Sequence, residues 1–446
     1  MKSFLAVFMI LGAQNIFATN TPDVLWTKTY GGQYRDKGRA VLQIADGGYI
    51  ICGYSCSFNV SGYKDVLLIK TDSIGDTLWI KTYGATSHET GYSVKPTMDN
   101  GYILCYYNSS SIGLIKTDSS GNEQWNKTYL SGGGTIGDAK QTMDGGYIIC
   151  SNTNTANSDV VLIKTDSNGD TLWTRTYVNA GTNYGYSVFQ TMNNGYIVCS
   201  GTANNIWIVR TNVSGDTLWT RIFSGTGYNM QKTTDGGYII CGGLNNNIGL
   251  IKIDSSGNEQ WSDTLAGSYA NSVQQTKDGG YITCGVNGFD AYLVKTDSAG
   301  IMQWAKAFND TAESEWMAVQ QTKDNGYILC GYTNPNGVSD VLLMKTGAEV
   351  PIEETGGKDF AFPQIKISPN PFFQKAVIKY QLSKKNHVSL IICDITGRIV
   401  KTLVNEQKSA GNYTATINEK ELRTGIYFVK LISGGYKEAK KLVLLK

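Results

Sequence analysis

The sequence predicts an all-β protein in which one four-stranded unit occurs seven times and is followed by a smaller β domain. The first observation is a repeated phrase, in which Gly-Tyr leads into a short apolar run that ends at a cysteine, with a mean spacing of about 46 residues. The second is that each copy holds short runs rich in Val, Ile, Tyr, Thr and Trp, separated by Gly, Asn and Asp, with no helical pattern. The third is a strand that the last copy lacks and that the chain supplies before the first copy. Together they predict a seven-bladed β-propeller closed by its N-terminal strand. The alternating runs beyond the last copy predict a small β-sandwich after it.

The chain begins with the features of a secretory signal peptide. Lys2 precedes an apolar stretch from Phe4 to Gly12, and Ala18 offers a small residue at a cleavage point. The stretch is too short for a transmembrane helix. We therefore expect a signal peptide at residues 1–18 and export of the rest of the chain.

The predicted propeller occupies residues 19–346, and its repeats carry three marks, of which the last repeat lacks the third. The apolar run of the repeated phrase ends at Cys52, Cys105, Cys150, Cys199, Cys241, Cys284 and Cys330. A second apolar run ends at a basic residue, which is Lys70, Lys116, Lys164, Arg210, Lys252, Lys295 or Lys345. A turn of the type Asp-x-x-Gly then leads to Trp79, Trp125, Trp173, Trp219, Trp261 or Trp304. The two middle runs are apolar at consecutive positions, which is typical of strands covered on both faces, as in stacked blades.

The count of tryptophan strands predicts how the ring closes. The last repeat ends at Lys345 and Thr346 without a tryptophan strand after it, whereas residues 25–30, before the first repeat, match residues 78–83. Placing the N-terminal strand in the last blade removes an exposed sheet edge.

The cysteine spacing argues against a disulfide framework in the repeats. Equivalent positions in neighbouring blades lie about 10 Å apart, which is farther than a disulfide allows. We expect the seven repeated cysteines to be buried free thiols and Cys393 to lie in a core. Cys56 could pair with Cys52 if the chain bends back between them.

After the last repeat the composition changes. Residues 347–361 contain Glu, Gly and Pro and are interpreted as a linker. Residues 362–446 lack the repeated phrase, but they contain alternating runs typical of a small antiparallel sandwich. We expect these strands at residues 376–380, 388–393, 398–403, 411–417, 425–431 and 439–445.

This C-terminal region resembles a known family. The resemblance rests on four motifs: Ile367-Ser368-Pro369-Asn370-Pro371-Phe372, Asp394-Ile395-Thr396-Gly397-Arg398, the run from Gly425 to Leu431, and the terminal stretch from Lys440 to Lys446. In this order they resemble the type A C-terminal sorting domain of the type IX secretion system, and they are similar to hook-capping-type Ig-like domains. The resemblance implies passage across the outer membrane, the secretion machinery as a partner, and a secreted or surface-attached protein. A plain accessory sandwich is the alternative.

Charge and hydropathy exclude two other classes of function. Lys plus Arg number 39 and Asp plus Glu 37, which gives a net charge of +2 with no basic run. The electrostatic signature of a nucleic-acid-binding protein is therefore absent. Nothing after residue 20 approaches the length of an apolar membrane span.

Candidate catalytic and cofactor residues are sparse. The turn from Lys70 to Trp79 resembles the tryptophan-docking motif of pyrroloquinoline quinone propellers and the Asp-box of sialidases, but its spacing differs from both. Its Asp and Gly fit a plain hairpin turn, and calcium binding there by Asp72 and Asp76 lacks the dense carboxylate spacing of a calcium loop. The two histidines, His88 and His387, do not make a multi-histidine metal site. We expect no cofactor and no metal.

Positions that differ between repeats are free to serve binding. Just before each innermost strand stand Arg39, Tyr92, Gly137, Tyr186, Tyr228, Asn271 and Met317, with Asp36, His88, Glu89, Tyr184, Asn229, Tyr269 and Trp316 nearby. Aromatic rings beside Asn, Asp and Arg suit sugars or peptide segments. Packing of the loop layer by the same tyrosines is the competing interpretation.

The sequence therefore favours a secreted, non-catalytic propeller that binds an extracellular glycan or protein ligand through its variable loops. The alternative is a secreted polysaccharide hydrolase or lyase that uses His88, Glu89 or the pair Glu313 and Glu315 as acid or base.

Overall fold

The structure of the protein is a computed structural model that describes residues 21–349 and 364–445. Within these ranges it leaves out residues 59–62, 85–86, 109–110, 130–136, 154–157, 203, 309–312, 336, 383–384, 395–397, 410 and 434–435. The expected signal peptide and most of the expected linker lie outside the described residues. The chain divides into two compact units, with the boundary between residues 350 and 351.

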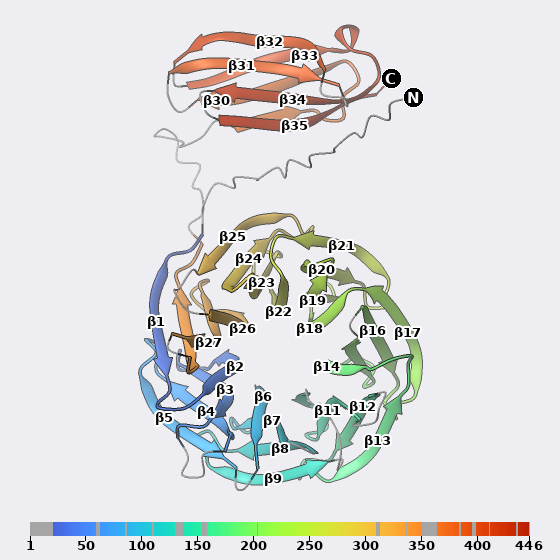
Figure 1. The fold of residues 1–446 in the computed structure, drawn as a ribbon. Coiled ribbons are helices and arrows are strands. Elements are labelled where there is room, and N and C mark those ends of the chain that lie inside the picture. The colour runs from blue at the N-terminus through green and yellow to red at the C-terminus, as the bar shows by residue number, and fades with distance from the viewer. Residues whose placement is uncertain are drawn as a thin grey trace, which may run out of the picture. The chain divides into compact units, whose positions relative to one another are not determined.

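In its described part the first unit contains seven four-stranded antiparallel sheets, and their innermost strands, among them β2, β6, β14, β18, β22 and β26, lie nearest the centre in Figure 1. The first sheet holds β2 (Asp36–Gln43), β3 (Tyr49–Ser55), β4 (Asp65–Thr71) and β5 (Thr77–Tyr83). The second holds β6 (Glu89–Pro96), β7 (Tyr102–Asn108), β8 (Ser111–Thr117) and β9 (Glu123–Tyr129). The third holds β10 (Asp138–Gln141), β11 (Tyr147–Asn152), β12 (Val160–Thr165) and β13 (Thr171–Tyr177). The fourth holds β14 (Tyr184–Gln190), β15 (Tyr196–Gly201), β16 (Asn205–Thr211) and β17 (Thr217–Ser224).

The other three sheets follow the same order. The fifth holds β18 (Thr226–Lys232), β19 (Tyr238–Leu244), β20 (Asn247–Ile253) and β21 (Glu259–Leu265). The sixth holds β22 (Tyr269–Gln275), β23 (Tyr281–Asn287), β24 (Asp290–Thr296) and β25 (Met302–Phe308). The seventh joins β26 (Glu313–Gln321), β27 (Tyr327–Asn334) and β28 (Asp340–Thr346) to β1 (Val24–Tyr30), which pairs with β28. The all-β class and the repeated four-stranded sheets are thus confirmed.

The two middle strands of each sheet form its buried part. All seven residues of β3 are buried, and so are the six of β11 and the six of β12, whereas Tyr177 is the one buried residue of the outermost strand β13. Apolar side chains of one sheet cluster with those of its neighbour: Ile50 and Cys52 pack in one cluster with Leu104 and Ile115 of the next sheet. Stacking of sheet on sheet explains why the middle runs are apolar at consecutive positions.

Three kinds of contact join neighbouring sheets. The outer tryptophan packs edge-to-face on the Gly-Tyr tyrosine of the next sheet, with 5.5 Å between the ring centroids of Trp125 and Tyr147. A tyrosine hydroxyl of the outermost strand donates to the turn glycine of the next sheet, as Tyr83 does to the Gly121 carbonyl at 2.6 Å. A glutamine side chain accepts from the hairpin of the preceding sheet, as Gln190 does from the Met143 amide at 2.8 Å.

The same contacts occur between the last sheet and the first. Trp26 of β1 packs on Tyr49 at 5.8 Å, and the Tyr30 hydroxyl donates to the Gly75 carbonyl at 2.6 Å. The Gln43 side chain accepts from the Lys323 amide at 2.9 Å. The two ends of the repeat region therefore interact as consecutive repeats do.

The Asp-x-x-Gly sequences form hairpin turns, which is the structural role expected for them. Asp72 Oδ1 accepts from the amides of Ile74 and Asp76, and Gly75 adopts a φ of 82° that favours glycine. The Asp76 carboxylate pairs with Lys28 of β1 at 2.8 Å. The Asp72 carboxylate therefore holds the turn together, and the Asp76 carboxylate contacts the neighbouring sheet. We call such a boundary between neighbouring sheets a seam.

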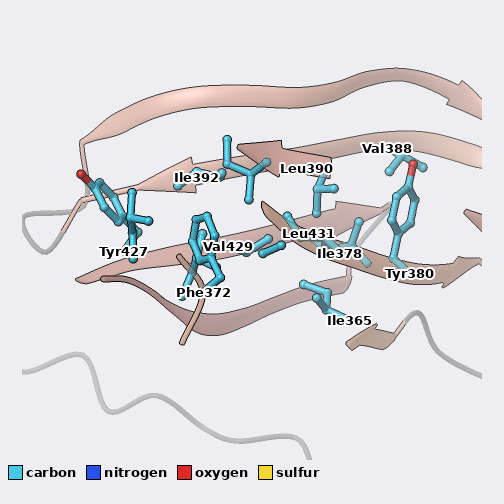
Figure 2. Close-up of a cluster of buried hydrophobic side chains, with 14 of the residues drawn as sticks. Ile365, Phe372, Ile378, Tyr380, Val388, Leu390, Ile392, Tyr427, Val429 and Leu431 are labelled. Carbon is cyan, nitrogen blue, oxygen red and sulfur yellow. The ribbon is translucent and has the colours of Figure 1, made fainter. Parts of the chain in front are cut away.

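The second unit is a small two-sheet β domain. One sheet holds β29 (Gln364–Ser368), β30 (Lys375–Leu382) and β33 (Gly411–Asn418). The other holds β32 (Ile399–Lys408), β31 (Asn386–Cys393), β34 (Gly425–Ser433) and β35 (Tyr436–Leu444), and a 3₁₀ turn, η1 (Glu419–Glu421), follows β33. Figure 2 shows the core between the sheets, in which Phe372, Ile378, Leu390 and Val429 are fully buried. The six expected strands are present, and β29 is an addition.

Candidate functional site

Two sets of loops differ between repeats: those that follow each repeated cysteine and those that join one sheet to the next. The register of the strands places these variable loops at one end of the first unit. In the first sheet Asp36 pairs with Ser55 and Ser55 with Asp65, so the start of β2 and the loop after Cys52 share one end. Gln43 pairs with Tyr49 and Thr71 with Thr77 at the opposite end, where the hairpin turns that vary little between repeats lie. The connections between sheets also enter at the first end, which we call the variable end.

At the variable end the innermost strands share a β-bulge. In β2 Gly38 pairs with Gly53 and Ala40 with Cys52, so Arg39 has no partner in the ladder. The equivalent unpaired residues in the other innermost strands are Tyr92, Tyr186, Tyr228, Asn271 and Met317. A bulge adds one residue and redirects its side chain. These six residues, which we call the bulge ring, are therefore the predicted ring positions; the seventh, Gly137, directly precedes β10.

Small residues next to the bulge fit over the cysteines of the preceding sheet. A Cβ atom on Gly91 would lie 2.6 Å from Cys52 Sγ and 2.8 Å from the Gly53 carbonyl oxygen. A Cβ on Gly38 would collide with Cys330 Sγ in the same way. The repeated cysteine thus fills the space that the missing side chain leaves. All nine cysteines are free and the seven repeated ones are fully buried, which confirms the prediction of buried thiols.

Four tyrosines form a continuous arc along part of the ring. Ring centroids are 6.3 Å apart for Tyr184 and Tyr186, 5.6 Å for Tyr186 and Tyr228, and 5.8 Å for Tyr228 and Tyr269. The last two pairs meet edge-to-face, the favoured geometry of aromatic pairs. All four side chains are half-buried. The arc spans three successive innermost strands, β14, β18 and β22.

Glu315 joins this arc to the last sheet. Its carboxylate accepts from the Tyr269 hydroxyl at 3.1 Å, the Asn271 side-chain amide at 2.8 Å and the Tyr332 hydroxyl at 2.8 Å. Burial first, and then the charge of Glu315, raise the pKa of both tyrosines, so they remain neutral donors. The Lys37 ammonium lies 3.3 Å from the centroid of the Tyr332 ring.

Lys37 and Arg39, both in β2, give a positive charge to the part of the ring that the first sheet supplies. Burial lowers the pKa of Lys37, and the nearby Glu315 acts in the opposite direction. The Arg39 guanidinium stacks over Tyr92 at 4.6 Å, and its Nε has no hydrogen-bond partner in the described part of the chain. The variable end therefore offers aromatic rings, one hydrogen-bonded carboxylate and two cations in sequence.

The remaining predicted site residues occupy other places. Asp36 and Trp316 are fully buried and Glu89 is 7% exposed, so these three lie behind the ring rather than on its surface. His88 is exposed; its Nδ1 accepts from the Lys64 amide at 3.0 Å, and its ring packs on Tyr63. Asn229 Oδ1 accepts from the Val273 amide at 3.4 Å and so connects two sheets.

Sequence reasoning missed part of the site. Lys37 and Tyr332 were not predicted, and Glu315 was considered only as one of a catalytic pair. A signal existed for Tyr332, because it occupies the second position after its cysteine, as Tyr54 does. Within the described residues no group of three or more His, Cys, Asp or Glu side chains is gathered around a common point. No helix in the described part of the chain is long and apolar enough to span a membrane.

Residues 366–445 match the family described as the secretion system C-terminal sorting domain. This match indicates secretion through the type IX system to the cell surface or the extracellular space, and it implies interaction with that machinery. No curated protein sequence matches the chain.

Solved structures similar to this chain include Raptor from Chaetomium thermophilum, with 7% identity over 74% of this chain and 30% of Raptor, at a TM-score of 0.52. The Dos1 propeller is 13% identical over 64% of this chain and 75% of its own, at 0.44. A catalytically inactive virginiamycin B lyase from Staphylococcus aureus is 14% identical over 72% and 98%, at 0.48. At such identities the likeness concerns the fold alone, which is one of repeated four-stranded sheets of the propeller type.

Proposed function

We propose that the first unit of this secreted protein is a seven-bladed propeller, closed by β1, that binds an extracellular oligosaccharide at its variable end without chemical conversion. The sorting domain delivers this binding module outside the cell. Closure is supported by the contacts of Trp26, Tyr30 and Gln43, which repeat between the last and first sheets the seam found between consecutive repeats.

The observation that carries the proposal is the bulge ring itself. A bulge at one position of six innermost strands directs side chains of four types, three of them tyrosines, to the same end of the unit, and a glycine precedes four of the six. Bulges often redirect side chains next to functional sites. Packing alone would favour similar residues at these positions, as it does at the cysteines.

The chemistry of the ring favours a polar ligand with apolar faces. The arc from Tyr184 to Tyr269 supplies aromatic carbon and phenol groups, and Arg39 supplies a guanidinium that stacks on Tyr92. Such surfaces bind sugar rings by apolar contact and directional hydrogen bonds. Because three donors already occupy Glu315, its carboxylate positions Tyr269 and Asn271.

The hydrolase alternative receives less support from the geometry. His88 Nδ1 is bound by the Lys64 backbone amide, and Glu89 is too deeply buried for a polysaccharide to reach. Glu313 is exposed, but its strand neighbour Glu315 is held by three hydrogen bonds. A general acid must lie within reach of the bond that it protonates.

A glycan array probed with the full chain, followed by calorimetry on the strongest oligosaccharide, tests the proposal. We expect Tyr228→Ala to weaken the binding of that oligosaccharide at least about tenfold, because it removes the middle of the aromatic arc. Tyr34→Ala is the matched control, since Tyr34 is exposed outside the arc. Equal loss in both variants, a preference for peptides over glycans, or cleavage of the oligosaccharide would each contradict the proposal.

A further inference from the structure

Three junctions between neighbouring sheets share one polar arrangement at the variable end. The amide of the residue that leads into the innermost strand donates to a carbonyl of the preceding sheet: Asp36 to Ser339 at 2.6 Å, Glu89 to Lys64 at 2.7 Å and Asn183 to Ser158 at 2.6 Å. In each case an aspartate directly follows the accepting residue, and these are Asp340, Asp65 and Asp159. Two of the three junctions therefore bring two acidic side chains together.

The junction of the first and second sheets buries both of its acids. Asp65 is 6% exposed and Glu89 7% exposed. Glu89 Oε1 accepts from the Ser87 hydroxyl, whereas Oε2 has no hydrogen-bond partner among the residues described. A Cβ atom on Gly84 would lie 2.9 Å from that Oε2 and still closer to Asp65 Oδ1. The absent Gly84 side chain thus leaves a cradle into which both carboxylates point.

The junction of the seventh and first sheets repeats this cradle. A Cβ on Gly31 would lie 3.0 Å from Asp36 Oδ2 and closer to Asp340 Oδ1, which has no hydrogen-bond partner in the described part of the chain. Ser339 is 4% exposed, and its hydroxyl also lacks a partner there. Asp36 is fully buried and accepts from the Gly32 amide and the Ser57 hydroxyl.

Neither glycine is explained by backbone conformation. Gly31 and Gly84 do not adopt the positive φ values found at Gly47 and Gly75. Both stand where a methyl group would displace a carboxylate, so what they preserve is the space itself. A buried space lined by oxygen atoms is suited to a cation or to water.

The electrostatics of the two junctions favour a cation. Burial first, and then the facing Asp65, raise the pKa of Glu89, with Ser87 and His88 acting in the opposite direction. Burial and then Asp36 raise the pKa of Asp340. Facing carboxylates are stabilised by a shared proton or by a bound positive ion, and three of these four are buried while Asp340 is half-buried. Carboxylate, hydroxyl and carbonyl oxygens are the ligands that Ca²⁺ prefers.

We propose that the acidic junctions Asp65/Glu89 and Asp36/Asp340 each bind one calcium ion between neighbouring sheets. Water molecules and main-chain carbonyls complete the coordination. With two carboxylates per site, the affinity falls in the range of extracellular calcium modules, with dissociation constants of about 0.1 to 1 mM. Such sites fill outside the cell, where the sorting domain delivers the protein.

The test compares the full chain in EDTA with the full chain in about 10 mM CaCl₂, by thermal unfolding at pH 7. We expect calcium to raise the midpoint temperature by about 3 °C, because an ion that binds only the folded state stabilises it by mass action. Equilibrium dialysis with radioactive calcium should then show bound metal. MgCl₂ at the same concentration should have a smaller effect, since Mg²⁺ demands stricter geometry.

Conservative variants assign the effect to the junctions. Glu89→Gln and Asp340→Asn should each reduce the calcium-dependent shift by about half, and Gly84→Ala should do the same by filling the cradle. Asp263→Asn, which alters an exposed carboxylate on β21, is the matched control and should keep the full shift. A calcium effect that survives the first two variants unchanged would place the ion elsewhere. If calcium leaves the midpoint temperature unchanged while a fall in pH from 7 to 5 raises it, the two carboxylates share a proton and the proposal is overturned.

Discussion

The repeated cysteine and the glycine above it are complementary partners in neighbouring sheets. Cys330 Sγ occupies the volume that a Cβ on Gly38 would need, and Cys52 does the same below Gly91. Burial raises the pKa of Cys52 to about 12, so the thiol stays neutral and unreactive. Seven cysteines in an exported protein are therefore explained by packing, without oxidation.

Alkylation distinguishes the buried thiols from that of Cys56, which is more accessible. Cys56 is half-buried, whereas Cys393 and the seven repeated cysteines are buried. In native protein at pH 8 we expect iodoacetamide to modify Cys56 alone, slowly because burial and then Asp36 raise its pKa. All nine should react in denaturant without a reductant, as mass spectrometry can count. Cysteines that react only after reduction would contradict this.

The complementarity of Gly38 and Cys330 can be measured with a double-mutant cycle. Gly38→Ala should lower the free energy of unfolding by about 2 kcal/mol, because the added methyl overpacks the junction. Cys330→Ala removes the colliding sulfur, so the double variant should be more stable than the two single losses predict. Urea unfolding gives the three values. Strict additivity would show that the two residues do not share this space.

At the scale of the strand and its hairpin, a lysine of the third strand is paired with an aspartate of the first hairpin. The Lys252 side chain is 4% exposed and its ammonium lies 2.7 Å from Asp235, and Lys295 pairs with Asp278 in the same way. In the fourth sheet Arg210 takes the lysine position and donates to Thr191 Oγ1, and Asn193 replaces the aspartate. The two positions change together because they form one contact.

These pairs predict loss of stability in acid. Burial acts to raise the pKa of Asp235, but hydrogen bonds from Lys252, Thr233 and the Gly237 amide outweigh it and lower the pKa to about 2. A depressed pKa stabilises the fold above the unfolded value of about 4, and this contribution is lost as the pH falls from about 4 to about 2. Asp235→Asn should therefore flatten the decline of the melting temperature across that window. Asp263→Asn should keep the wild-type slope, and an unchanged slope in Asp235→Asn would refute the assignment.

Periodicity in the sequence was sufficient for the strands but not for the site. The runs at Tyr49 and Asp65 repeat with their turns, so their alternation and length predict strands within a residue or two. The bulges at Tyr186 and Tyr228 depend on a one-residue mismatch between paired strands, and only the register reveals it. The Glu315 group joins side chains from three strands, and no local pattern encodes that convergence.

At the scale of the whole molecule, the short strand β1 holds two neighbouring sheets together. It supplies the outermost strand of the sheet β26–β28, packs Trp26 on Tyr49 and bonds Gly75 through Tyr30. Each of these contacts has counterparts between consecutive repeats. Its removal would open two seams at once.

Deletion of residues 23–31 should therefore destabilise the entire first unit. We expect a single thermal transition of that unit, lowered by about 10 °C or more, rather than the loss of one sheet, because an unpaired edge exposes both seams. Calorimetry on the deleted chain provides the measurement. Melting behaviour identical to that of the intact chain would argue that the repeats do not depend on closure.

The second unit should govern destination and not the stability of the first. A chain ending at Glu349 retains every described strand of the repeats and lacks the sorting domain. In a host with a type IX system we expect this chain to remain inside the outer membrane, with the thermal transition of the repeats unchanged. Immunoblots of cell fractions and culture medium provide the test, and normal appearance in the medium would exclude the sorting role.

The pairing of Val24 with Thr346 also sets an order of events for a chain that crosses a membrane from its N-terminus. The first strand to emerge has to wait, with its edge unsatisfied, until the last repeat has followed it. Contacts between such distant segments form slowly, because the intervening chain must be brought together first. A chain interrupted before the last repeat would therefore leave β1 without β28, the strand with which it pairs.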